Sequence, residues 1–173
     1  MSTTAANLVG LAKKYQASPE ATVRRYVEIS PDPLAAVFFC WKLKPTQEQN
    51  LPHADQATFF GIDSGELAWT LRKLRVQYAI TNHAFDDFEM HIPRDKSTEG
   101  SGVVQRAAAR NKCLDDEEYF DVGACRGRFQ ISAIPLYTER NDVGPNGEKN
   151  VVAVIRPLAK RHSVQGMPAG LFT

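Results

Sequence analysis

Histidine and cysteine are the side chains in this sequence best suited to metal and nucleophilic chemistry, and there are four histidines and three cysteines. The pattern His-Glu-x-x-His places two imidazoles one helical turn apart, where they hold zinc with the glutamate as general base. No histidine here has a second histidine three or four residues away; the four are His53, His83, His91 and His162. The chain therefore lacks this catalytic pattern, and we predict that it is not an enzyme.

A zinc site built from residues far apart in the chain is an alternative, with His83, His91, Cys113 and Cys125 as candidate ligands. We favour the simpler interpretation, in which the histidines lie on the surface and the thiols lie in the core. We therefore predict no metal, no cofactor and no catalytic residue. An enzyme of an unrecognised kind is kept as a third hypothesis.

The cysteines also indicate the compartment. Cys40, Cys113 and Cys125 are odd in number, widely spaced and free of any Cys-x-x-Cys pair, which is typical of free thiols in a reducing environment. No apolar run approaches the roughly 20 residues of a membrane-spanning helix, and the first residues lack the features of a signal peptide. We predict a cytoplasmic protein without a membrane partner.

Two acidic runs and one glycine turn are weaker candidates for ion binding. Asp86, Asp87 and Glu89, like residues 115–118, have the oxygen atoms that a hard cation prefers, but they lack the spacing of a calcium loop. We interpret both runs as solvated loops. Ser101 and Gly102 resemble a phosphate-binding turn, yet no Gly-x-x-x-x-Gly-Lys is present, so we interpret Ser101 as a helix cap.

Aromatic side chains form the candidate ligand pocket. Those that we predict to line a small-molecule cavity inside a sheet domain are Phe39, Trp41, Phe60, Trp69, Tyr78 and Phe129. The alternative is that most of them fill the core.

Four cations near the N-terminus are candidates for DNA binding. Lys13, Lys14, Arg24 and Arg25 lie in or beside a pair of predicted helices, where they could meet phosphates. The spacing differs from the usual DNA-reading motif, because Gln16 stands in the turn and the Thr-Val pair comes one residue late. The alternative is a packing element with solvated arginines.

The elements that position these residues begin with that helical pair. Ser18 can cap a helix whose first residue is Pro19, and Glu20 suits the positive helix end. The apolar spacing of Val23, Tyr26 and Val27 predicts one buried stripe, and residues 8–15 carry a similar stripe. We predict a helical hairpin over residues 1–32, joined near Gln16 and ended by Pro31 and Pro33.

The remaining chain predicts a sheet domain. Residues 34–41 form an apolar run typical of a buried strand, and residues 73–81 alternate with Leu74, Val76, Tyr78 and Ile80 on one face and Arg75 on the other. Residues 128–137 and 151–156 predict an antiparallel hairpin, and residues 102–111 a helix. Residues 57–62 predict another short strand, whereas residues 45–56 and most of 83–100 read as loops.

Composition supports one main domain. The 173 residues are 43% hydrophobic, and 21 basic against 20 acidic residues leave a net charge of +1. No overall field therefore draws the chain to nucleic acid or anionic membranes. We predict an α+β fold with a helical hairpin at 1–32, a GAF-like or PAS-like antiparallel sheet domain with a covering helix at 33–158, and a mobile tail at 159–173.

Residues 11–30 are similar to the segment that closes the metallopeptidase region of the ImmA/IrrE family, with a Leu-Ala, a Ser cap and an Arg-Arg pair at matching spacing. Residues 33–41, 74–80, 92–97 and 134–136 resemble the C-terminal, GAF-like region of its longer members. The resemblance implies a relationship to zinc peptidases that cleave a transcriptional repressor, but the missing His-Glu-x-x-His implies a chain without that activity.

The leading hypothesis is therefore a non-catalytic regulatory or sensor domain that binds a small-molecule ligand or docks a zinc-peptidase domain or a repressor protein. The alternative is a small DNA-binding transcriptional regulator that uses the helical hairpin.

Overall fold

In the computed structural model, residues 4–50, 64–98, 102–137 and 143–158 are described. The predicted strand at 57–62, the aromatic Phe60, the cap Ser101 and the tail at 159–173 lie outside these residues. The elements are α1 (Ala5–Lys14), α2 (Pro19–Ile29), β1 (Ala35–Lys42), α3 (Pro45–Gln49), α5 (Ser64–Thr70), β2 (Lys73–Thr81), α6 (His83–Asp86), α7 (Val103–Arg110), β3 (Leu114–Val122), β4 (Cys125–Pro135) and β5 (Val151–Pro157).

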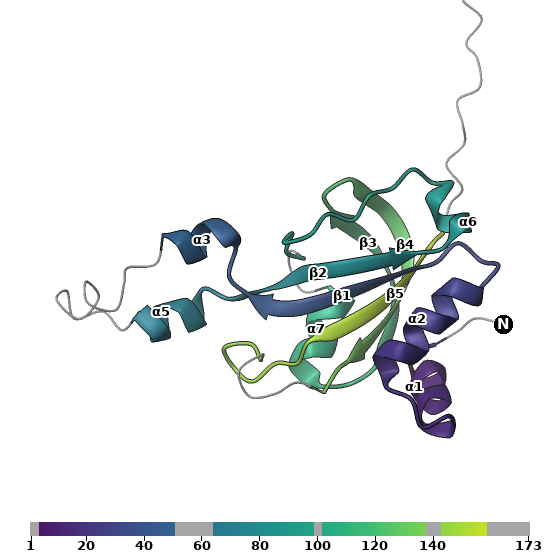
Figure 1. The fold of residues 1–173 in the computed structure, drawn as a ribbon, viewed down its shortest axis with the longest axis horizontal. Coiled ribbons are helices and arrows are strands. Elements are labelled where there is room, and N and C mark those ends of the chain that lie inside the picture. The colour runs from purple at the N-terminus through teal and green to yellow at the C-terminus, as the bar shows by residue number, and fades with distance from the viewer. Residues whose placement is uncertain (1–3, 51–63, 99–101, 138–142, 159–173) are drawn as a thin grey trace, which may run out of the picture.

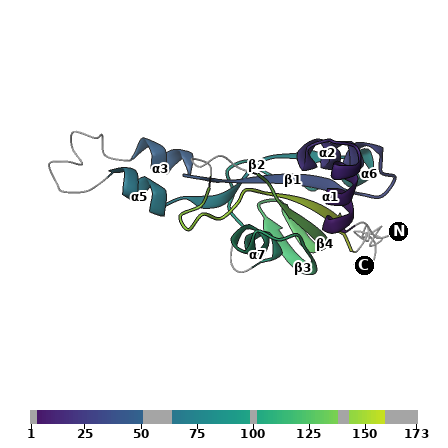
Figure 2. The same cartoon turned by 90° about the horizontal axis from the view of Figure 1, so that it is seen from below.

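A five-stranded antiparallel sheet forms the centre of the fold, with strand order β2-β1-β5-β4-β3 (Figure 1). Helices α1 and α2 cover one face and α7 covers the other, so the body has three layers (Figure 2). The short helices α3 and α5 project beyond one end of the sheet (Figure 1). The predicted α+β class is confirmed.

Alternate side chains of β1 belong to the apolar clusters on opposite faces of the sheet. Val37 and Phe39 join the apolar cluster under α7, whereas Ala36 and Phe38 join the cluster under α1 and α2. Both faces of a strand in this position are buried, which explains why its sequence is a nearly continuous apolar run.

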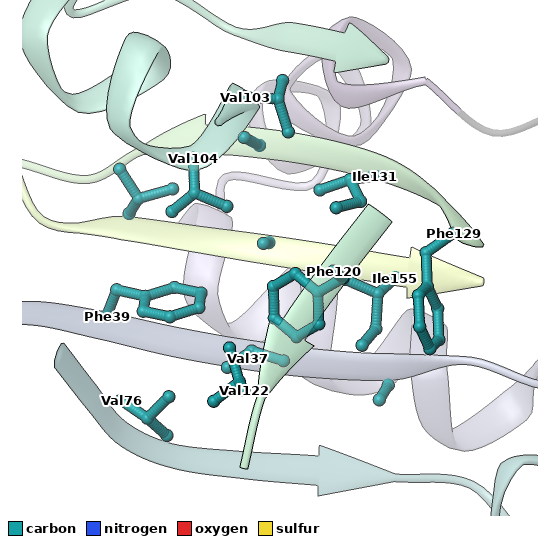
Figure 3. Packing of buried hydrophobic residues seen from close by; sticks show 14 of the residues in the cluster. Val37, Phe39, Val76, Val103, Val104, Phe120, Val122, Phe129, Ile131 and Ile155 are labelled. Carbon is teal, nitrogen blue, oxygen red and sulfur yellow. The ribbon is translucent and has the colours of Figure 1, made fainter. Parts of the chain in front are cut away.

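The core under α7 also contains the outer strand β3. Phe120 and Val122 of β3 lie over β1 and β5, near Val37 and Ile155 (Figure 3). Helix α7 adds Val103 and Val104 to the same cluster. The sheet therefore curls, and its edge strand β3 comes over the face that α7 covers.

The N-terminal helices begin where local chemistry predicts. Ser18 Oγ accepts a hydrogen bond from Ala21 N at 3.1 Å, and Pro19 is the first residue of α2. Thr4 Oγ1 caps α1 in the same way through Asn7 N. The two caps satisfy backbone donors that a helix start would otherwise leave unpaired.

A β-bulge corrects the predicted faces of β2. Phe38 pairs with Tyr78 and Phe39 pairs with Val76, so Gln77 is an extra residue in β2. Val76 therefore faces α7, whereas Tyr78 faces α2. The prediction that Leu74, Val76, Tyr78 and Ile80 share one face was wrong because one inserted residue reverses the alternation.

Three other predictions need correction. Residues 45–49 were predicted as loop but form α3, in which Pro45 suits the first helical turn and Gln47 Oε1 accepts from Lys44 N at 3.0 Å. The acidic run at 115–118 was predicted as a loop but belongs to β3, because pairing with β4 outweighs low strand propensity. Helix α7 has Gly102 as its N-cap residue, in place of the predicted Ser101.

The junction between α2 and β1 is fixed by one buried side chain. Asn82 is 8% exposed. Its Oδ1 accepts from Leu34 N at 3.1 Å and Phe85 N at 3.0 Å. Its Nδ2 donates to Ser30 O at 3.0 Å and Asp32 O at 2.6 Å. Asn82 thus ties the end of β2 to the segment that connects α2 to the sheet.

None of the helices in the described residues has both the length and the apolar character needed to cross a membrane.

Candidate functional site

An open groove of about 850 Å³ lies between the two edge strands of the sheet. Its walls come from the starts of α3, β2 and α7, from residues 94–98, and from β3 with the turn that follows it. Val104, Phe120 and Val122 are among its apolar lining residues. The groove depends on the curl of the sheet, because that curl brings β3 toward α7 and the segment beside β2.

The segment beside β2 is held by backbone hydrogen bonds. Val76 N donates to Lys96 O at 2.8 Å, and Asp95 N donates to Val76 O at 2.9 Å. Arg75 and Ser97 form an isolated antiparallel bridge. The chain thus returns along the exposed edge of β2 and places Arg94, Asp95 and Lys96 at the groove.

Positive charge dominates the groove. It is lined by six cationic and three acidic side chains, which gives a net charge of +3. The cations are Lys44, Lys73, Arg75, Arg94, Lys96 and Arg126. The whole chain has a net charge of only +1, so the cations are concentrated locally. Such a site attracts anions.

The three acidic residues already have partners. Asp95 Oδ1 lies 2.6 Å from Lys42 Nζ, and Asp121 Oδ1 lies 2.9 Å from Arg126 Nε. Glu118 Oε2 accepts a hydrogen bond from Val103 N at 2.8 Å, so its carboxylate lies at the positive end of α7. Within the described residues, no ion pair joins the other five groove cations to a carboxylate.

Gly102 leaves room for that arrangement of α7 and β3. A Cβ atom at Gly102 would lie 2.8 Å from Glu118 Oε1. Glycine therefore allows the carboxylate to approach the first turn of the helix.

Arg75 is the most deeply placed cation of the groove, with 6% of its surface exposed. Its Nη1 donates to Asp95 O at 3.0 Å, and its Nη2 donates to Gln47 Oε1 at 3.5 Å. Its Nε is buried and has no acceptor among the described residues. Desolvation lowers the pKa of Arg75, partly opposed by the charge of Asp95; a guanidinium nevertheless stays protonated at neutral pH.

Both edge strands also contact the N-terminal helices. On β2, Tyr78 lies three residues after Arg75; its hydroxyl donates to Glu20 Oε1 at 2.5 Å and accepts from Arg24 Nη2 at 2.7 Å. On β3, Asp115 lies three residues before Glu118, and its Oδ1 accepts from Ala5 N at 2.8 Å. Each edge strand therefore joins the groove to one N-terminal helix.

The four predicted DNA-binding cations differ in exposure and in the protein groups that they contact. Arg24 lies over the rings of Phe38 and Tyr78, at 5.5 and 4.9 Å, so it fixes α2 to the sheet. Its pKa is raised, first through the hydrogen bond to Tyr78. Lys13 and Lys14 are exposed on α1, and Arg25 forms an exposed ion pair with Glu28 at 3.3 Å.

The five described members of the predicted aromatic pocket do not line one cavity. Phe39 and Phe129 are fully buried in the core under α7, whereas Tyr78 stacks on Phe38 on the other face. Trp41 Nε1 donates to Lys149 O and Trp69 Nε1 donates to Pro145 O, so both indoles hold loop backbone. The β-bulge puts Tyr78 on the face opposite Phe39 and Phe129, and Trp69 lies on α5, outside the sheet.

The candidate zinc ligands also lie apart. No group of three His, Cys, Asp or Glu side chains suited to a metal ion occurs among residues 4–50, 64–98, 102–137 and 143–158. His83 is exposed beside Asp87. Burial raises the pKa of the Cys125 thiol to about 12, and burial also raises the pKa of Cys113.

Sequence reasoning missed the groove because its residues come from distant segments. Arg75 was predicted on the face opposite Leu74, but its burial could not be foreseen. The sequence does contain one signal: two pairs of cations, each with a spacing of two residues. They are Lys73 with Arg75, and Arg94 with Lys96.

No protein-family model matches the chain, and no curated protein matches it.

Proposed function

We propose that this chain is a non-catalytic regulatory domain, similar to the C-terminal part of ImmA/IrrE proteins, in which a GAF-like sheet domain senses a small-molecule ligand. The ligand site is the groove between β2 and β3. The two N-terminal helices dock on a zinc-peptidase domain of another chain or on a repressor protein, and ligand binding in the groove changes this docking.

The double contact made by each edge strand is the observation that carries this proposal. On β2, the groove residue Arg75 lies three residues before Tyr78, which contacts α2. On β3, the groove residue Glu118 lies three residues after Asp115, which contacts α1. A ligand that shifts either strand would change the contacts of the helix attached to it. Coupling between two sites requires such an element, whose position both sites influence.

The hydrogen bonds between Tyr78 and helix α2 are weak enough for a bound ligand to break. Glu20 and Arg24 have side chains that are 44% and 45% exposed, so their bonds to Tyr78 compete with water. Interactions of this kind contribute on the order of 1 kcal/mol, which a ligand of modest affinity can offset.

The test reconstitutes the chain with a zinc peptidase of the ImmA/IrrE type and its repressor, and measures the rate of repressor cleavage. We expect this chain to change that rate, and we expect Tyr78→Phe to weaken the change while the domain stays folded. Arg110→Lys, an exposed substitution on α7, is the control. An unchanged cleavage rate would remove the proposed partner, and zinc with peptidase activity in the isolated chain would remove the non-catalytic assignment.

A further inference from the structure

We infer that the groove recognises the phosphate or carboxylate group of a small anionic ligand, and that the Nε and Nη2 atoms of Arg75 bind it. This inference rests on the proposed function, because it gives the chemical class of the ligand sensed by the same groove.

The first argument is the unequal use of the three nitrogen atoms of Arg75. Nη1 is held at 3.0 Å by Asp95 O. Nη2 reaches Gln47 Oε1 only at 3.5 Å, the long limit of a hydrogen bond, and Nε has no acceptor among the described residues. Nε–H and one Nη2–H point in the same direction, and this edge matches two oxygens of a carboxylate or phosphate.

The second argument is charge. A buried charged group is costly unless it is paired and hydrogen-bonded. Arg75 is buried beside four other groove cations that have no ion pair within the described residues: Lys44, Lys73, Arg94 and Lys96. An anion would supply the missing acceptor and reduce the repulsion among these side chains.

The third argument concerns the size of the ligand. Only 6% of Arg75 is exposed, so a phosphate fixed in the backbone of a duplex cannot approach its guanidinium closely. A volume of about 850 Å³ is within the range of small-molecule sites. The geometry therefore favours a free small molecule with a terminal anionic group over nucleic acid.

Gln47 is the side chain that an incoming anion must replace. It is half-buried on α3, a helix that buries no residue of its own, and its Oε1 also accepts from Lys44 N. Displacement of Gln47 frees the Nη2 edge of Arg75 and removes the acceptor of the Lys44 amide. Binding should therefore be visible at the start of α3 as well as at Arg75.

The experiment titrates the full chain with inorganic phosphate, at an ionic strength held constant with chloride, and follows backbone amide and arginine Nε resonances by NMR. We expect shifts at Arg75 Nε and Lys44 N at low-millimolar phosphate. Arg75→Lys keeps the charge but loses the two-pronged edge, so phosphate affinity should fall about tenfold or more. Arg110→Lys should bind phosphate as the parent does.

Gln47→Ala provides a second variant that leaves the buried arginine intact. It removes the internal competitor, so we expect phosphate to bind several-fold more tightly. Equal phosphate affinity in the parent, Arg75→Lys and Gln47→Ala chains would overturn the inference, as would shifts confined to lysines outside the groove.

A matched pair of probes separates this inference from the proposed function. Ribose 5-phosphate should shift the groove amides of Val104 and Gln105, and ribose should not. If ribose binds as well as ribose 5-phosphate, the anionic class is wrong and the groove remains a ligand site. If neither sugar nor phosphate shifts the groove, the anionic class is wrong, and the proposed regulation is then decided separately by the cleavage assay.

Discussion

Replacing Asn82 with alanine should loosen the junction between the N-terminal helices and the sheet. The side chain makes four hydrogen bonds, two as acceptor and two as donor. In the alanine variant, Leu34 N loses its acceptor at a residue that is 4% exposed. An unsatisfied buried donor costs about 1–3 kcal/mol, and loss of the cap on α6 costs about 1 kcal/mol more.

We therefore expect Asn82→Ala to lower the free energy of unfolding by about 3 kcal/mol. For a chain of this size each kcal/mol lowers Tm by about 2–4 °C, so Tm should fall by about 6–12 °C. Chemical denaturation and calorimetry measure both quantities. Asn7→Ala on the exposed side of α1 is the matched control and should change stability by less than about 0.5 kcal/mol.

Asn82→Asp tests which half of the side chain matters. Oδ1 can still accept from Leu34 N and Phe85 N, but the second carboxylate oxygen faces the carbonyl oxygens of Ser30 and Asp32. This repulsion favours the protonated acid, so the pKa of the new carboxyl should be raised above its unfolded value of about 3.9. The associated stability is present below the unfolded pKa and is lost as pH rises through the folded pKa.

The aspartate variant should accordingly approach the parent in stability near pH 4 and fall behind it near pH 7, whereas the alanine variant should show no such dependence relative to the parent. If Asn82→Ala costs less than about 1 kcal/mol, the four bonds do not hold the junction, and the reasoning from buried donors is refuted. Equal pH dependence of the two variants would refute the role given to the Nδ2 donor.

Two further predictions concern the turn between β3 and β4 and the first residue of β4. Gly123 has φ +66°, and a Cβ there would overlap the Pro93 ring, so Gly123→Ala should lower the free energy of unfolding by about 2 kcal/mol or more in urea titrations. A neutral result would show that the turn and Pro93 separate easily. Cys125 is buried beside Met90 with a pKa raised to about 12, so a thiol reagent at pH 8 should modify Cys113 and Cys40 first and reach Cys125 only on unfolding. Rapid labelling of Cys125 in the native protein, measured by mass spectrometry, would contradict this.

Local signals predicted several elements well. The capping serine and proline fixed the start of α2, and the apolar run at 34–41 gave β1, because both signals act within a few residues. The boundaries of β2 at Lys73 and Thr81 also match the prediction. Short-range sterics and hydrogen bonding suffice for such elements.

The groove and the aromatic layers could not be predicted in the same way. The bulge at Gln77 depends on the register between β1 and β2, and it decides whether Tyr78 faces the N-terminal helix or the core under α7. Burial of Arg75 depends on residues 94–98 folding back along β2. Both depend on long-range strand pairing, which cannot be predicted from the periodicity of a single segment.

The acidic sequence of β3 has a consequence for self-association. This strand pairs with β4 on one side and lies at the edge of the sheet, with Asp115, Asp116 and Glu117 exposed. A second copy docking edge to edge through β3 would bring carboxylates opposite carboxylates, and like charges about 4 Å apart repel by about 1 kcal/mol even in water. The edge thus discourages extension of the sheet by its own copies, in the way that charged edge strands limit aggregation. That protection weakens as salt shortens the Debye length from about 10 Å at 0.1 M to about 3 Å at 1 M.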